Sequence, residues 1–424
     1  MAKVTLASLM ASAVMMSGAA AVAQDAEASV SVKNRPNSDY DAKGVPAGGF
    51  TFFPALDVSG AWNDNIYATK AGKEDDFITT VKPSVRLASN WNQNSLAVYA
   101  DADFGYYSDA TGEDYKDYTI GVDGRADIDS GSYFSGGLNY GDKHEDRGAP
   151  DSAANAAEPT SYSVFNADVA YKRDVSVFSL GLDSSFVKTS YDDTALNGGG
   201  FTSQGHRDRE RYTYGARVGY EIGEGTEAYV RATGNVVNYD NSKLNGGPQR
   251  NSDGYEAVVG AKLDLSGKTA FDGYVGMVKQ DYDGGSLKPI KEMTYGMSLL
   301  WNPSQMTSII SNVSRSVLET AVFEVNGSDV FVAASGLLNT SYTFRVEHEL
   351  RRNIMLEAGV GYSTMDFKGT VRSDEIVSAD IGVEYLLNRN VRLAASHKIE
   401  DKSTNVGRGE FKRNVTMLNL KAQF

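Results

Sequence analysis

Side chains that could do chemistry are sparse in this sequence. The chain has no cysteine and only four histidines, which excludes thiolate metal sites and leaves little for a histidine cage. No G-x-S-x-G elbow, phosphate-binding loop or H-E-x-x-H pair is present. Acidic runs such as residues 74–76 could bind calcium, although such runs are more often solvated loop tips. We therefore expect no catalytic residue, no bound metal and no cofactor.

Charged residues instead recur singly along alternating segments, on their polar side. Eleven of them are candidates for the lining of a water-filled lumen: Arg86, Asp101, Asp123, Arg125, Asp183, Arg217, Arg231, Lys262, Arg345, Glu357 and Arg392. Both signs occur, with no ladder of a single sign. One interpretation is mutual neutralisation along a solvated wall. The other is a polar lining that offers a large hydrophilic solute weak, repeated contacts.

The elements that must position these side chains repeat with a period of two. Residues 377–387 alternate apolar with polar or small side chains, and residues 255–265 and 354–362 do the same. Such runs reach about 12 to 15 residues, whereas strands of soluble proteins average about five or six. A tilted strand needs about 9–11 residues to cross a bilayer. The pattern favours membrane strands over a soluble β-sandwich or propeller.

The connections alternate between short turns and longer polar loops. Eight short and nine long connections predict 18 strands, and weak patterning near Gly285 and Ser314 leaves 16 as the alternative. Bacterial single-chain barrels have an even number of strands, with short periplasmic turns and longer outer loops. We expect an all-β, antiparallel, up-and-down transmembrane barrel over residues 50–424. A barrel of this size holds water or inward-folded loops, because side chains cannot fill it.

Aromatic residues gather at both ends of the predicted strands. Those beside the long loops include Tyr107, Tyr115, Tyr162, Tyr191, Tyr212, Tyr239, Tyr255 and Tyr282; those beside the short turns include Trp91, Tyr133, Tyr171, Tyr220, Trp301 and Tyr385. Amphipathic rings prefer the headgroup level of a bilayer. We expect two girdles facing lipid.

The first 23 residues have the features of a secretory signal peptide. Lys3 precedes an apolar stretch at residues 6–20, and Ala-Val-Ala at 21–23 forms a cleavage site. With a formal net charge of −14, the chain lacks the basic stripe that nucleic-acid binding requires. We expect a Gram-negative outer-membrane protein. Residues 24–49 show no alternation. They are a disordered periplasmic lead-in, a plug, or a contact with a periplasmic partner.

The last strand ends in an apolar alternation with an aromatic terminus. Leu420 and Phe424 lie on one face of it. Such an ending is similar to the signal that the β-barrel assembly machinery binds. We expect this machinery and outer-membrane lipid to be partners of the chain.

Short motifs follow one another in order through the first third of the mature chain. They are Arg35, Tyr40, Gly44, Gly48-Gly49-Phe50, Pro54, Asn63-Asp64-Asn65-Ile66-Tyr67, Asp75-Asp76, Pro83, Ser89-Asn90-Trp91, Glu145-Asp146-Arg147-Gly148-Ala149-Pro150 and Glu158-Pro159-Thr160. This order resembles the β-barrel porins of the second type, which often accompany exopolysaccharide biosynthesis and secretion loci. The resemblance implies an outer-membrane channel for an exopolysaccharide, with a periplasmic secretion component as a further candidate partner. It supplies no binding residues.

Three functions remain open at the level of sequence. The first is exopolysaccharide export through a passive channel. The second is a porin that takes up small solutes, in which an inward-folded loop narrows the lumen; residues 153–159 and 197–206 are long enough for that. The third is a structural or adhesive barrel plugged by its own loops.

Overall fold

The structure is a computed structural model that describes residues 30–153, 155–241, 247–265, 267–325 and 331–424. The predicted signal peptide, residues 1–23, lies outside the described residues and stays a prediction. Among the described residues, no helix is both long enough and apolar enough to span a membrane.

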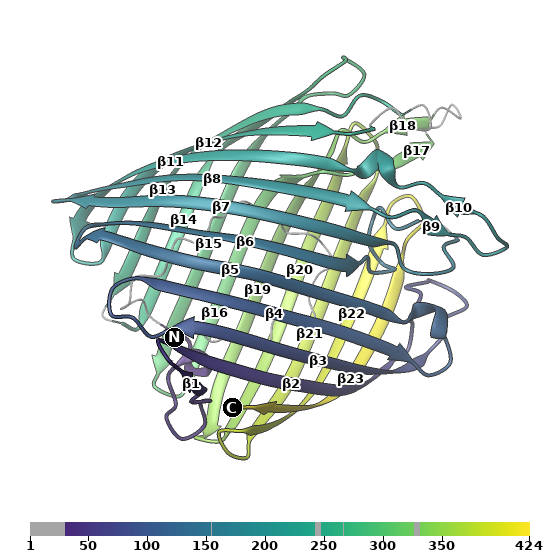
Figure 1. Cartoon of the computed structure of the whole chain (residues 1–424). Coiled ribbons are helices and arrows are strands. Elements are labelled where there is room, and N and C mark those ends of the chain that lie inside the picture. Colours follow the sequence, from purple (N-terminus) through teal and green to yellow (C-terminus); the bar gives the residue numbers. More distant parts are fainter. Residues whose placement is uncertain (1–29, 154, 242–246, 266, 326–330) are drawn as a thin grey trace.

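Eighteen antiparallel strands form a closed barrel (Figure 1). They are β2 (Phe50–Asn63), β3 (Asp76–Ser89), β4 (Ser95–Tyr107), β5 (Tyr115–Asp129), β6 (Ser132–His144), β7 (Ser161–Val175), β8 (Phe178–Tyr191), β11 (Arg209–Gly223), β12 (Thr226–Tyr239), β13 (Ser252–Leu265), β14 (Thr269–Tyr282), β15 (Ile290–Ser304), β16 (Thr307–Leu318), β19 (Gly336–Arg351), β20 (Ile354–Lys368), β21 (Ser373–Leu386), β22 (Val391–Thr404) and β23 (Phe411–Gln423). Each strand pairs with the next along the chain, and β2 pairs with β23 to close the sheet. The predicted fold class and the count of 18 are confirmed.

The side chains of each strand alternate between an outer face that meets lipid and an inner face that meets water. On β21, Val377 and Ile381 are 54% and 63% exposed on the outer face. Asp380, between them, lies on the opposite face with Arg345, because Arg345 pairs with Gly359 and Gly359 with Asp380. Apolar side chains on the outside and charged ones on the inside are what a barrel between lipid and water requires.

The predicted girdles are correct only in part. Trp91, Tyr220, Trp301 and Tyr385 are exposed beside the short turns, and Tyr255 is exposed near the long loops. The strand-end tyrosines Tyr133, Tyr162 and Tyr239 are instead buried, at 6%, 6% and 7% exposure. The most exposed tyrosines of the long-loop half are Tyr106, Tyr118, Tyr140, Tyr214, Tyr255, Tyr342 and Tyr362. The predicted girdle residue Tyr212 lies on the same outer face as Tyr214, two residues along β11. A shift of one residue reverses the face of a strand side chain, and at strand ends the inner face packs against loops.

Smaller elements decorate the two ends. At the short-turn end, β1 (Val45–Ala47) pairs with the start of β2. The long-loop end carries two hairpins, formed by β9 (Thr194–Ala195) with β10 (Phe201–Thr202) and by β17 (Phe323–Val325) with β18 (Phe331–Ala333). The described residues also form three single-turn 3₁₀ helices: η1 (Val32–Asn34), η2 (Thr111–Glu113) and η3 (Gly205–Arg207). Long outer loops and short periplasmic turns are the asymmetry of outer-membrane barrels, so the long-loop end is the extracellular end.

Candidate functional site: the inner face and the segments that cross it

Strand pairing places the eleven candidate lining residues on one face of the sheet, the face opposite the exposed apolar side chains. Arg231 contacts Asp183 at 2.8 Å and Arg345 contacts Glu357 at 3.2 Å, so two candidate pairs come together. The other contacts of the set are Arg217 with Glu227, Arg125 with Asp127, Arg345 with Asp380, and Arg392 with Glu384 and Asp41. Within the described part of the chain, Arg86, Asp101, Asp123 and Lys262 form no ion pair. Their role as a lumen lining stays a prediction.

Asp123 on β5 and Asp168 on β7 face each other across Gly137 of β6. The three residues share one row of the sheet. A Cβ at Gly137 would lie 2.8 Å from Asp123 Oδ1 and 3.5 Å from Asp168 Oδ1, so any larger residue would displace the Asp123 carboxylate. The glycine therefore leaves room for two carboxylates on this part of the inner face. Among the described residues, no group of three potential metal ligands occurs.

Arginines lie over inward tyrosines at three places on the wall. The Arg125 guanidinium is 3.6 Å from the centre of the Tyr133 ring, and Arg217 is 4.0 Å from that of Tyr229. Near the extracellular end, Arg207 lies 3.9 Å from the Tyr191 ring. Such cation–π contacts fix the arginine planes against the wall.

The loop between β6 and β7, residues 145–160, crosses the extracellular end of the barrel. We call it loop 3. Asp146 accepts a hydrogen bond from Arg413 of β23 at 3.1 Å, and Arg413 also contacts Glu400 of β22. The carbonyl of Gly148 accepts from Lys402 of β22 at 3.1 Å. Arg413 and Lys402 lie on the inner face, and four strands separate β23 from β6 around the wall. Loop 3 therefore lies within the mouth.

Loop 3 continues to the far wall. Its Asp151 accepts hydrogen bonds from Thr320 Oγ1 and the Ala321 amide, both at 2.9 Å, in the loop between β16 and β19. That loop, residues 319–335, is called loop 7. Seven strand steps of the 18 separate β7 from β16 around the barrel. The contact between the two loops therefore bridges the extracellular opening.

Buried arginines fasten these loops. Arg207, 4% exposed, donates to Glu145 at the start of loop 3 at 2.5 and 3.1 Å. Arg250, 2% exposed, donates to the carbonyls of Thr320 and Ala334 at 2.7 and 2.9 Å, at the two ends of loop 7. Carbonyls buried without a donor are costly, so Arg250 holds both ends of loop 7 together.

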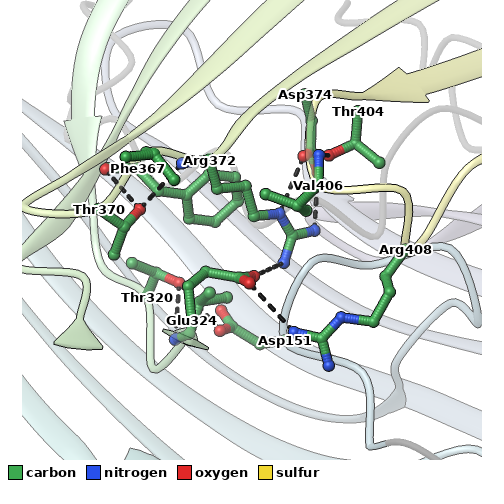
Figure 2. A network of polar contacts seen from close by, with 12 residues as sticks. Asp151, Thr320, Glu324, Phe367, Thr370, Arg372, Asp374, Thr404, Val406 and Arg408 are labelled. Atoms are coloured by element: carbon green, nitrogen blue, oxygen red, sulfur yellow. Dashed lines mark hydrogen bonds and ion pairs between the residues drawn. The ribbon is translucent and has the colours of Figure 1, made fainter. Parts of the chain in front are cut away.

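A second network anchors loop 7 to the rim of β21 (Figure 2). Glu324 of loop 7 lies between Arg372 at 3.3 Å and Arg408 at 3.0 Å. Arg372 also binds both oxygens of Asp374, at 2.9 and 2.8 Å. Asp374 is fully buried and contacts Lys402. The same lysine binds loop 3, so the two loops share one anchor.

Two loop residues have displaced pKa values that depend on this packing. Burial raises the pKa of the Asp146 carboxyl, but the Arg413 guanidinium and the Gly148 amide outweigh it and hold the pKa below its usual range. Burial lowers the pKa of His206 in η3, and the neighbouring Arg207 and Arg250 lower it further. Its Nδ1 is buried without a hydrogen-bond partner. The docked loops therefore favour an ionised Asp146 and a neutral His206.

The N-terminal arm enters the opposite mouth. The amide of Val32, a residue 4% exposed, donates to Ser308 Oγ at 2.7 Å. Lys33 forms an ion pair with Glu357. Farther along, the Tyr40 carbonyl accepts from Arg392 at 3.2 Å. Because Ser308, Glu357 and Arg392 all lie on the inner face, residues 30–41 dock inside the short-turn end of the barrel.

The sequence indicated residues 153–159 and 197–206 as inward-folding loops and residues 24–49 as a candidate plug, but it did not identify the contacts that hold loop 3 or the arm. The partners of loop 3 and of the arm lie hundreds of positions away, as with Asp146 and Arg413 or Lys33 and Glu357. A usable signal was the motif around residues 145–150, which supplies Asp146, Arg147 and Gly148.

Comparison with known proteins adds the family to this geometry. The family model described as "Putative beta-barrel porin 2" matches residues 37–424. The chain belongs to this family of porins. It is therefore an outer-membrane channel protein rather than an enzyme, with its outer face in lipid. No curated protein matches the chain.

Solved barrels of Pseudomonas aeruginosa are similar at low identity. OpdK with vanillate matches with a TM-score of 0.43 and 10% identity, over 88% of this chain and 99% of its own. OccK2 (OpdF) matches with a TM-score of 0.47 and 8% identity, over 88% and 98%. OpdO matches with a TM-score of 0.43 and 13% identity, over 88% and 97%.

Proposed function

We propose that this porin is a channel for small hydrophilic solutes whose path is narrowed from both ends by its own chain. The observation that carries the proposal is loop 3, which is fastened inside the mouth through Asp146 to Arg413 and through Asp151 to Thr320. The docked arm narrows the other end. A docked loop lowers the size of solute that passes, while the mixed charges behind it provide weak, repeated contacts.

The experiment is a solute-flux assay on the full mature chain in liposomes. Neutral sugars of increasing size are added outside, and the rate of swelling reports entry. We expect entry of monosaccharides and a steep fall between di- and tetrasaccharides. Equal entry of much larger oligosaccharides would contradict a narrowed path, and no entry of any sugar would favour the plugged structural barrel.

Passage of an exopolysaccharide is the second candidate. The mixed charges of the inner face support it, because residues of both signs, such as Arg217, Arg231 and Asp183, offer an acidic sugar chain weak, repeated contacts. Polymer passage requires loop 3 and the arm to leave the lumen. A deletion strain should then retain polysaccharide in the periplasm and lose it from the medium. Unchanged secretion in that strain would eliminate this candidate.

A further inference from the structure

Four tyrosines of the inner face lie flat against the wall, each over a glycine of the neighbouring strand. They are Tyr99 over Gly121, Tyr115 over Gly105, Tyr229 over Gly260 and Tyr274 over Gly296, and each tyrosine pairs directly with its glycine. A Cβ at any of these glycines would overlap the tyrosine ring. The glycines therefore let one face of each ring rest on the sheet, and the other face turns toward the lumen.

Two of the four rings are covered on the side of the lumen. His144 stacks on Tyr115 with ring centres 3.9 Å apart, and Arg217 lies 4.0 Å from the centre of the Tyr229 ring. Tyr99 and Tyr274 are instead partly exposed. In the part of the chain that the structure describes, neither a cation nor a second ring lies against either of them. Two aromatic faces are therefore open to a solute.

These two open faces lie at similar levels on opposite walls. β4 and β14 are eight strand steps apart in the barrel of 18 strands. Tyr99 is four residues past the start of β4 at Ser95, and Tyr274 is five residues past the start of β14 at Thr269. Both strands begin at a short turn, so the two rings face the periplasmic half of the lumen.

Uncharged hydrogen-bonding groups continue the row beside each ring. Beyond Gly121, the next residue of the row is Asn139 of β6. Beyond Gly296, it is Ser314 of β16. Amide and hydroxyl groups both donate and accept hydrogen bonds, which is what the hydroxyl groups of an uncharged solute require.

Charges of both signs border the two rings. The charged inner-face residues next to Tyr99 in the pairing are Arg86, Asp101 and Asp123. Asp272, two residues before Tyr274 on the same face, lies opposite Lys262 and accepts a hydrogen bond from Tyr229 at 2.7 Å. Each ring thus has a carboxylate nearby that accepts hydrogen bonds from hydroxyl groups and repels an acidic solute.

We propose that Tyr99 and Tyr274 are stacking sites for uncharged sugar rings that pass through the lumen. The proposal rests on the function proposed above, a channel for small hydrophilic solutes, and it names one class of solute. One face of a pyranose ring exposes C–H groups, which pack on the face of an aromatic ring. Its hydroxyl groups reach the amide, hydroxyl and carboxylate groups beside each tyrosine. Contact with a single ring is weak, so the sugar leaves as readily as it enters.

Block of the ionic current by maltose, measured on the full mature chain in planar bilayers, tests these sites. We expect the Y99L/Y274L variant to need a roughly tenfold higher maltose concentration for half block than the wild type. The Y99F/Y274F variant keeps both rings and should be blocked like the wild type. Tyr115→Leu is the matched control, because that ring also lies over a glycine but is covered by His144. Heat-modifiable mobility on gels verifies folding, and the single variants replace the double variant if that fails to fold.

Comparison with sugar flux separates the stacking sites from the channel itself. Entry of sugars into liposomes without maltose block in the wild type would overturn the stacking sites and leave the channel, whereas the absence of both would overturn both. Equal block of the wild type and Y99L/Y274L would also overturn the stacking sites. Choline is the last probe, because a quaternary cation suits an aromatic face and a carboxylate. Block by choline at lower concentrations than by maltose, lost in Y99L/Y274L, would assign the rings to organic cations and overturn the sugar proposal.

Discussion

Replacing Asp146 by asparagine should weaken the attachment of loop 3 to the wall of the barrel. The substitution keeps the size of the side chain but removes the charge that Arg413 contacts at 3.1 Å. Arg413 retains Glu400 at 3.2 Å, so the variant does not leave an isolated buried charge, which would cost about 3–5 kcal/mol. What is lost is one charge-assisted hydrogen bond, about 1.5–3 kcal/mol.

Exposure to solvent lowers the free energy of this hydrogen bond, because the Asp146 side chain is 32% exposed. We therefore expect the lower range, about 1–2 kcal/mol, which raises the ratio of undocked to docked loop by roughly 5- to 30-fold. Single-channel recordings in planar bilayers should show longer or more frequent high-conductance openings. Glu158→Gln, on the exposed part of the same loop, is the matched control. If Asp146→Asn conducts like the control, loop 3 is not held by this contact.

The loop between β8 and β11, residues 192–208, contains His206 and contacts loop 3 through Arg207 and Glu145. Acidification should loosen this contact. The pKa of His206 is lowered in the docked state, so the undocked loop takes up a proton more readily. Docking therefore weakens as the pH falls below about 6.5. Conductance should rise over that range, and His206→Gln should abolish the rise. Arg250→Gln removes the donor to two buried carbonyls of loop 7, which destabilises the docked loop by about 1–3 kcal/mol for each unsatisfied carbonyl. Loop 7 should then be cleaved by protease added to intact cells. Protection equal to wild type would show that Arg250 is dispensable. Phe424→Asp should reduce the amount of protein in outer-membrane fractions through failed recognition, since a carboxylate near the interface costs only about 0–1 kcal/mol; normal abundance would remove Phe424 and Leu420 as an assembly signal.

Period-two alternation carried most of the fold prediction. Segments such as residues 377–387 meet lipid on one side and water on the other, and each residue obeys that constraint independently of its distant neighbours. The count of 18 strands therefore followed from sequence. The constraint ends where the strand leaves the membrane, which is why Tyr162 and Tyr239 were assigned to lipid although they are buried inside.

The candidate site was less accessible to sequence. Alternation assigned residues such as Arg231 and Asp183 to one face of the sheet. It did not give the register between neighbouring strands, so their contact at 2.8 Å appears only in the structure. Loop 3 and the arm have no periodic pattern to follow. Their positions depend on partners such as Arg413 and Glu357, which are distant in the sequence.

The most direct test of a channel narrowed by its own chain is single-channel conductance with both segments released. The comparison is between the full mature chain and a variant that combines Asp146→Asn with removal of residues 30–41. We predict a low or flickering conductance for the full chain and a stable conductance several times larger for the variant. Identical conductance in the two proteins would contradict the account, because neither loop 3 nor the arm would then limit the path.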